Sequence, residues 1–235
     1  MNNQILGIHH ITAIAGAAQR NYDFYAKILG LRLVKKTVNF DDPGTYHFYY
    51  GNEQGSPGTI LTFFPWTHVK RGTNGTGMAT EIGYSVPAGS LEFWVNRFQE
   101  KNVSFNQPVE RLGEKILHFR DPDGLELFLV IPEKEDSRTA WTTAEVNAGA
   151  ATKGFHSITL LVRKVEATAK ILTDIFGYRL LKQEGSRYRF ITDAVSEANI
   201  VDIVESPDGK PGHGAGGTNH HVAFRVKERG TNGDT

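Results

Sequence analysis

The alternation of hydrophobic and polar positions divides the chain into short strand-like runs and a few amphipathic segments. A strand is predicted at residues 8–15. A helix follows, because apolar residues recur there at helical spacing: Tyr22, Tyr25 and Leu29. Three more strand-like runs come next, within residues 32–40, 45–52 and 58–66. This order predicts a strand-helix-three-strand (βαβββ) unit, here called a module, within residues 1–68.

The first module is repeated later in the chain without a gap. "HHIT" at 9–12 and "HSIT" at 156–159 are 147 positions apart, and "ILGLRLVKK" and "IFGYRLLKQ" share that offset. His9 is thereby paired with His156, and Gly30 with Gly177. Each glycine follows the predicted helix, where a left-handed C-cap favours glycine. The repeat predicts the same fold for both copies.

Two further modules complete the predicted organisation. Residues 78–131 contain a strand, a helix beginning near Ser90 and three strand-like runs at 103–112, 114–121 and 125–132, whereas residues 132–153 are polar and predicted to be a linker. The predicted domains are 1–131 (modules 1–68 and 78–131), the linker 132–153, and 154–235, with a third module and the first strand of a fourth. The fold class is therefore α+β, with tandem βαβββ modules, three complete plus the start of a fourth, forming curved mixed sheets around a cavity.

The fourth module is expected to be cut short. His156 and His220 are 64 residues apart, so a complete module needs about 60 more residues, whereas 14 follow His221. We therefore expect its helix and last three strands to be missing from this chain.

Composition excludes several classes of protein. The chain has no cysteine, which rules out disulfides and thiolate metal sites and is compatible with a cytoplasmic location. It carries 26 basic and 26 acidic residues, so it lacks the charge of a nucleic-acid or membrane-surface binder. No apolar run approaches the roughly 20 residues of a membrane span. A small neutral partner is favoured.

Two pairs of adjacent histidines stand in predicted strands: His9 with His10, and His220 with His221. Strand side chains alternate between faces, so strict alternation places the members of a pair on opposite faces. His9, His156 and His220 fall on the more apolar face, and His10 and His221 on the face with small or polar neighbours. The second histidine of each pair is therefore the candidate metal ligand.

A structural role is the usual reading of a lone strand histidine, and two pairs at equivalent positions of a repeat favour a metal instead. For the remaining histidines we expect structural or surface roles: His47, His68, His118 and His213.

These modules, with "HHITAIAG", "YAKILGLRLVKKTVNFDDPGTYHFYY", "GSPGTILTFFPW" and "NHHVAFRV", resemble the vicinal oxygen chelate superfamily, which includes glyoxalase I, bleomycin resistance proteins and extradiol dioxygenases. Within it, the chain is similar to bacterial ring-cleaving dioxygenases that act on hydroquinones. The resemblance implies a non-haem, extradiol-type oxidoreductase that acts on a hydroquinone- or catechol-like diol with O₂. It also implies an Fe(II) site, with Mn(II) as an alternative.

On the matching positions, the resemblance implies His10 and His221 as metal ligands and His9, Thr12 and His220 as catalytic residues beside the substrate. It further implies a glutamate as third ligand in the last strand of the fourth module. The equivalent place in the second module is Phe128, and Glu126, two residues earlier, is the alternative carboxylate.

Two other functions remain open at this point. One is a glyoxalase-type lyase or isomerase with Ni or Zn. The other is a metal-free protein that binds an aromatic compound and confers resistance to it. An unfinished module also exposes apolar surface and a strand edge, which favours a homo-oligomer.

Overall fold

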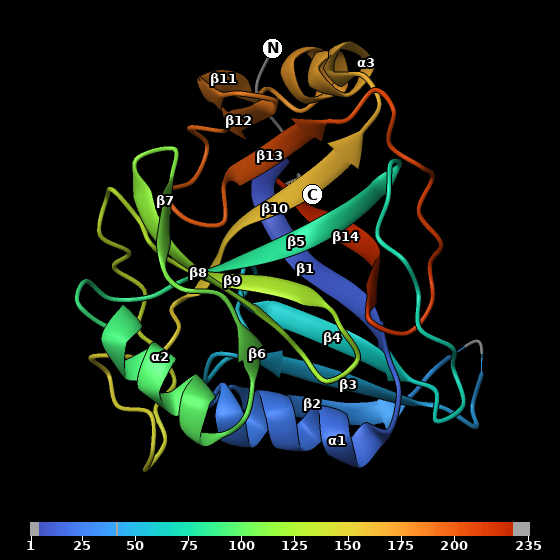
Figure 1. Ribbon diagram of the computed structural model, residues 1–235, viewed down its shortest axis with the longest axis vertical. Helices are drawn as coiled ribbons and strands as arrows, with labels where there is room; N and C mark the ends of the chain where they lie inside the picture. Colours follow the sequence, from blue (N-terminus) through green and yellow to red (C-terminus); the bar gives the residue numbers. More distant parts are fainter. Residues whose placement is uncertain (1–4, 41, 228–235) are drawn as a thin grey trace, which may run out of the picture.

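Two curved sheets form the molecule (Figure 1). The computed structural model describes residues 5–40 and 42–227. The five-stranded sheet has the order β14-β1-β4-β3-β2, with β1 Ile5–Ala15, β2 Arg32–Val38, β3 Tyr46–Gly51, β4 Ile60–Pro65 and β14 Thr218–Val226.

The second sheet has nine strands, in the order β11-β12-β13-β10-β5-β9-β8-β6, and β7 pairs with β8 off this path. Its strands are β5 Met78–Ser85, β6 Ser104–Phe105, β7 Val109–Arg111, β8 Glu114–Arg120, β9 Glu126–Ile131, β10 Gly154–Val162, β11 Arg179–Glu184, β12 Arg187–Ile191 and β13 Ile200–Glu205.

The predicted βαβββ arrangement is confirmed in all three complete modules. In each, the first strand pairs in parallel with the last: β1 with β4, β5 with β9, and β10 with β13. First strands of different modules then pair antiparallel, β1 with β14 and β5 with β10. The first module therefore pairs with β14, and the second pairs with the third, so that strands more than 200 residues apart in sequence lie side by side (Figure 1).

The helices of the first and third modules end in the same way. Helix α1 (Ala18–Tyr22) continues as a π-helical turn over Asp23–Ile28, and α3 (Val165–Lys170) continues as one over Ile171–Ile175. Gly30 and Gly177 then adopt φ values of 72° and 70°, as the predicted left-handed caps require. The second module has a regular helix, α2 (Leu91–Glu100). No described helix is long and apolar enough to cross a membrane.

One predicted strand is wrong. Residues 103–112 form two short strands, β6 and β7, instead of one, and Pro108 lies between them. Proline has no backbone N–H to donate and interrupts a strand for that reason.

A shared apolar core holds the modules together. The aromatic side chains of Tyr25, Tyr50, Phe63, Trp94 and Phe98 are all fully buried within one cluster. This core fixes the strands that carry the two histidine pairs.

Candidate metal centre

The pairing of β1 with β14 brings the two histidine pairs together. Thr12 stands opposite His221, and His10 stands opposite Ala223. The Nε2 atoms of His10 and His221 are 3.3 Å apart, and the two rings meet edge to face with centroids 5.4 Å apart. The expected convergence of these two imidazoles is therefore present in the fold.

This separation suits a shared metal ion. Two nitrogens that each lie about 2.1 Å from one ion, at an octahedral or tetrahedral angle, are about 3.0–3.4 Å apart. The distance between the two Nε2 atoms falls within that interval.

Strict strand alternation, used above to separate the members of each pair, does not hold at these positions. The register of β1 with β14 skips His9 between Ile8 and His10, and it skips His220 between Asn219 and His221. Each skip is a β-bulge, which adds one residue to a strand and turns a side chain toward its neighbour's face. His220 is accordingly exposed and not in the core, with its ring 5.9 Å from that of Phe64.

The bulges put the two imidazoles of each pair in direct contact. His9 Nδ1 lies 2.9 Å from His10 Nδ1, and His220 Nδ1 lies 2.8 Å from His221 Nδ1. In each contact one nitrogen donates and the other accepts. When the second histidine of a pair donates from Nδ1, its Nε2 is left unprotonated, which is the state that a metal ligand needs.

Desolvation and neighbouring histidines keep these imidazoles uncharged, although His10 is only half-buried and His221 is exposed. The pKa of His10 is lowered to about 4. Desolvation is the largest cause, and the nearby His9, His221 and His47 lower it further. Desolvation and His220 also lower the pKa of His221. Both side chains are therefore neutral at neutral pH, and a neutral imidazole can bind a cation.

A row of hydroxyl groups lies beside His221. Thr12 is 1% exposed, and its Oγ1 lies 2.9 Å from His221 Nε2 and 2.8 Å from Thr62 Oγ1. The strands that carry Thr12 and Thr62 are paired directly at these residues. Thr12 therefore contacts His221 Nε2 through a part-buried hydrogen bond.

His47, for which the sequence indicated only a structural role, also lies near the centre. Desolvation, followed by His221 and Lys35, lowers the pKa of His47 to about 4. Its Nδ1 lies 2.9 Å from the Tyr49 hydroxyl, and its ring is 4.3 Å from that of Phe64. Its Nε2 is buried without a hydrogen-bond partner among the described residues. No local pattern indicated that His47 lies near the centre, because it stands alone on a different strand, β3.

The described residues supply two of the ligands that a metal centre needs. His10 and His221 supply two neutral nitrogens, and no third histidine, cysteine or carboxylate completes a metal-binding group with them in the described part of the chain. Glu126 lies on β9 of the other sheet, where its carboxylate accepts a hydrogen bond from Arg120 Nε at 2.7 Å. Glu126 is therefore excluded as the third ligand.

In the second sheet, β10 pairs with β5 in the register in which β1 pairs with β14, but different side chains stand at the equivalent positions. Thr159, the repeat of Thr12, stands opposite Glu81 on β5, where β14 has His221. The Thr159 hydroxyl donates to Glu81 at 3.0 Å, and Arg111 and Arg187 form ion pairs with Glu81. His118 contacts Arg111, and desolvation followed by Arg111 lowers the pKa of His118 to about 4. Ion pairs occupy this second position, so it offers no free ligands.

Comparison with known proteins identifies relatives across nearly the whole chain. The Glyoxalase/Bleomycin resistance protein/Dioxygenase superfamily matches residues 7–129. The Bacillus subtilis protein named "Putative ring-cleaving dioxygenase MhqO" is 46% identical over 230 residues, which cover 97% of this chain and 72% of the relative. "Chlorohydroquinone/hydroquinone 1,2-dioxygenase" from Sphingobium indicum is 33% identical over 96% of this chain and 72% of its own length.

Solved structures agree on the fold. The crystal structure of a Bacillus subtilis protein named "putative dioxygenase", 46% identical, superposes with a TM-score of 0.88 over 94% of this chain and 70% of that one. Glyoxalase I from Zea mays superposes with a TM-score of 0.68 over 93% and 73% of the two chains, at 15% identity. The second likeness shows only the shared fold.

Proposed function

This chain belongs to the Glyoxalase/Bleomycin resistance protein/Dioxygenase superfamily, and we propose that it is a metal-dependent dioxygenase that opens the ring of a hydroquinone-type diol. The observation that carries the proposal is the 3.3 Å approach of His10 Nε2 and His221 Nε2. Relatives named as ring-cleaving and hydroquinone dioxygenases, at 33–46% identity, support the substrate class.

In this proposal His10 and His221 hold Fe(II), with Mn(II) as the alternative. The bound ion supplies the electron transfer that allows O₂ to react with an aromatic ring. Cleavage is of the extradiol type: a ring bond beside a hydroxylated carbon breaks, and both atoms of O₂ enter the product.

The first histidine of each pair orients the second through a hydrogen bond. His9 and His220 accept a hydrogen bond from Nδ1 of His10 and His221, which directs each Nε2 lone pair to the centre. The Thr12 hydroxyl lies 2.9 Å from the same His221 Nε2, so it must turn away from that nitrogen when the nitrogen binds an ion. His220 is exposed beside Phe64, where its protonated Nε2 can donate a hydrogen bond to a substrate oxygen.

His47 is suited to bind the second hydroxyl of the diol. Its Nε2 is buried and unpartnered, and a buried polar atom without a partner is rare in native structures. The row Tyr49, Thr62, Thr12 and His221 crosses four adjacent strands of the sheet. Three strand spacings of about 4.8 Å leave room for one aromatic ring between the two sides of this curved sheet.

Oxygen consumption tests the function. The protein, loaded with Fe(II) under anaerobic conditions, is mixed with methylhydroquinone and then with ¹⁸O₂. We expect one O₂ consumed per substrate and two ¹⁸O atoms in the product, with loss of activity in H10A and H221A. H68A is the matched control, because His68 is an exposed histidine on a surface loop. An intact, metal-loaded protein that consumes no O₂ refutes the proposal.

Metal analysis separates the remaining functions. A metal-free binding protein would purify without iron or manganese and bind the diol equally well after chelation. A glyoxalase-type enzyme would retain Ni or Zn and consume no O₂.

A further inference from the structure

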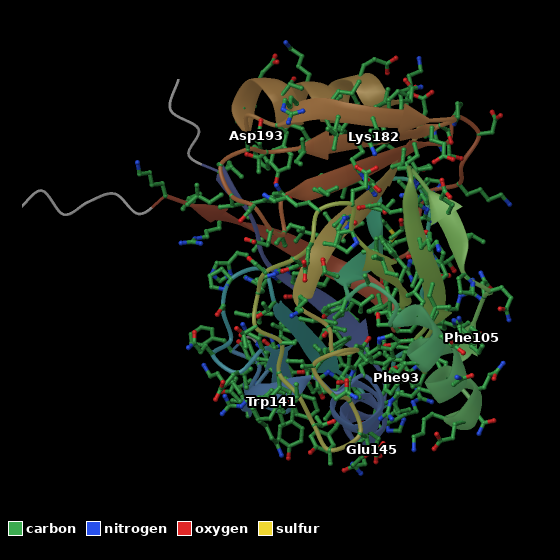
Figure 2. All side chains as sticks on the ribbon, turned by 90° about the vertical axis from the view of Figure 1, so that its left-hand side faces the viewer. Phe93, Phe105, Trp141, Glu145, Lys182 and Asp193 are labelled. Atoms are coloured by element: carbon green, nitrogen blue, oxygen red, sulfur yellow. The ribbon has the colours of Figure 1, made fainter. Side chains whose placement is uncertain are left out.

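A cavity of about 620 Å³ lies in the second sheet, away from the histidine pairs. It is bounded by the linker segment 132–138, the start of β10, strands β11 and β12, and the loop 192–199. None of the residues proposed for the metal centre lines it. Figure 2 shows two lining residues, Lys182 and Asp193, at the end of the molecule opposite Trp141 and Glu145. Its volume is typical of a small-molecule site, about 300–1,000 Å³.

Buried charged side chains line the inner wall of this cavity. Glu114, His156 and Arg189 are each at most 5% exposed. His156 Nε2 lies 3.1 Å from Glu114 Oε1, and Arg189 also forms an ion pair with Glu114. Burial alone would raise the pKa of Glu114, but His156 and Arg189 outweigh it and hold that pKa at about 2. The inner wall of the cavity therefore contains a carboxylate that His156 and Arg189 hold in its charged form.

Apolar side chains form part of the remaining wall, and strained backbone supports it. Its apolar side chains are Phe155, Leu181, Ile191, Val195, Ala198 and Ile200. Ala198 has a φ of 52°, although it is not glycine, and its carbonyl accepts the Ile8 N–H at 2.7 Å. A left-handed alanine costs about 1 kcal/mol or more, so surrounding contacts must hold the loop in this shape. Strain of this kind concentrates at functional sites.

Charge limits what the cavity can bind. Six carboxylates line it against four cationic side chains. Three of the cations are already paired within the lining: Arg138 with Asp136, Lys182 with Glu133, and Arg189 with Glu114. A further lining carboxylate, Asp193, is paired with Arg179 outside the lining, which leaves one excess negative charge that disfavours an anion. A hydroxyl group, in contrast, can donate to the carboxylate oxygens while an apolar ring contacts Phe155 and its neighbours.

We propose that this cavity is a second binding site, which takes a small uncharged aromatic molecule carrying a hydroxyl group. His156 is the residue of the third module that corresponds to His9 in the first. In the third module this position lines a cavity, whereas in the first it lies beside the proposed metal ligand His10. The site does not depend on the proposed dioxygenase activity.

Titration of the ¹⁵N-labelled full chain with phenol, followed by amide chemical shifts, tests the site without metal or turnover. We expect saturable shifts in the loop 192–199 and at the start of β10. The variant L181W fills the mouth of the cavity and should weaken this binding by about tenfold or more. L180W is the matched control, because Leu180 is the neighbouring exposed leucine of β11 and does not line the cavity.

A variant of the metal centre and a second ligand complete the experiment. H10A should bind phenol in this cavity as the unchanged protein does, even if it loses ring cleavage, which separates this site from the metal centre. Benzoate, the anion of similar size, should give no saturable shifts there. The proposal is overturned if phenol shifts only residues around β1 and β14, if L181W and L180W behave alike, or if benzoate binds as tightly as phenol.

Discussion

Replacing His9 by leucine should weaken metal binding without removing either proposed ligand. His9 Nδ1 lies 2.9 Å from His10 Nδ1, and in our proposal it accepts the His10 N–H. Without that acceptor, His10 can carry its proton on Nε2, which then cannot bind an ion. Loss of a hydrogen bond to a metal-binding histidine commonly costs 10–100-fold in metal affinity, or about 1.4–2.7 kcal/mol. We expect H9L to lose metal affinity within that range.

The matched variant is H9N. An asparagine Oδ1 can accept a hydrogen bond from nearly the position of a histidine Nδ1, so H9N should retain most of the affinity. Competition of Mn(II) against a chelating dye measures both variants, and the denaturation midpoint in urea shows whether each remains folded. The reasoning is refuted if H9L binds the metal as tightly as the unchanged protein, or if H9N is as weak as H9L while both are folded.

Three further predictions concern buried polar groups. Asp202 is fully buried and accepts hydrogen bonds from Arg189, so D202N should lower the free energy of unfolding by about 3–5 kcal/mol in urea denaturation; a loss below 1 kcal/mol would contradict this. Burial raises the pKa of Asp121 from 3.8 to about 6, so the folded state holds a proton that the unfolded state releases. The free energy of unfolding should therefore fall by about 2 kcal/mol from pH 4 to pH 6. D121N should remove that component of the slope, and parallel stability curves for the two proteins would refute it. H47F should raise KM for methylhydroquinone about tenfold with little change in kcat. Y49F, which leaves the His47 ring in place, should have a smaller effect. Equal KM values in H47F and the unchanged protein would exclude the proposed hydroxyl contact.

The repeat and the hydrophobic pattern determined most of the fold. An ungapped offset of 147 residues and two glycines after the helices were sufficient to predict matching modules, because local periodicity and helix caps depend on neighbouring residues alone. The same logic failed within residues 103–112, where an apolar pattern was interpreted as one strand despite Pro108.

Only the tertiary structure decided how the histidines are arranged. The sequence indicated His10 and His221, but strict alternation separated each from its neighbour, and the bulges at His9 and His220 bring the paired rings together. A bulge is a property of two paired strands, and the pairing of β1 with β14 joins residues more than 200 positions apart. His47 entered the site for the same reason, since its place depends on the packing of β3 beside β4 and on the curvature of the whole sheet. The candidate residues and the order of strands and helices could be predicted from the sequence. The approach of the histidine side chains to one another depends on contacts between distant strands, which no local pattern encodes.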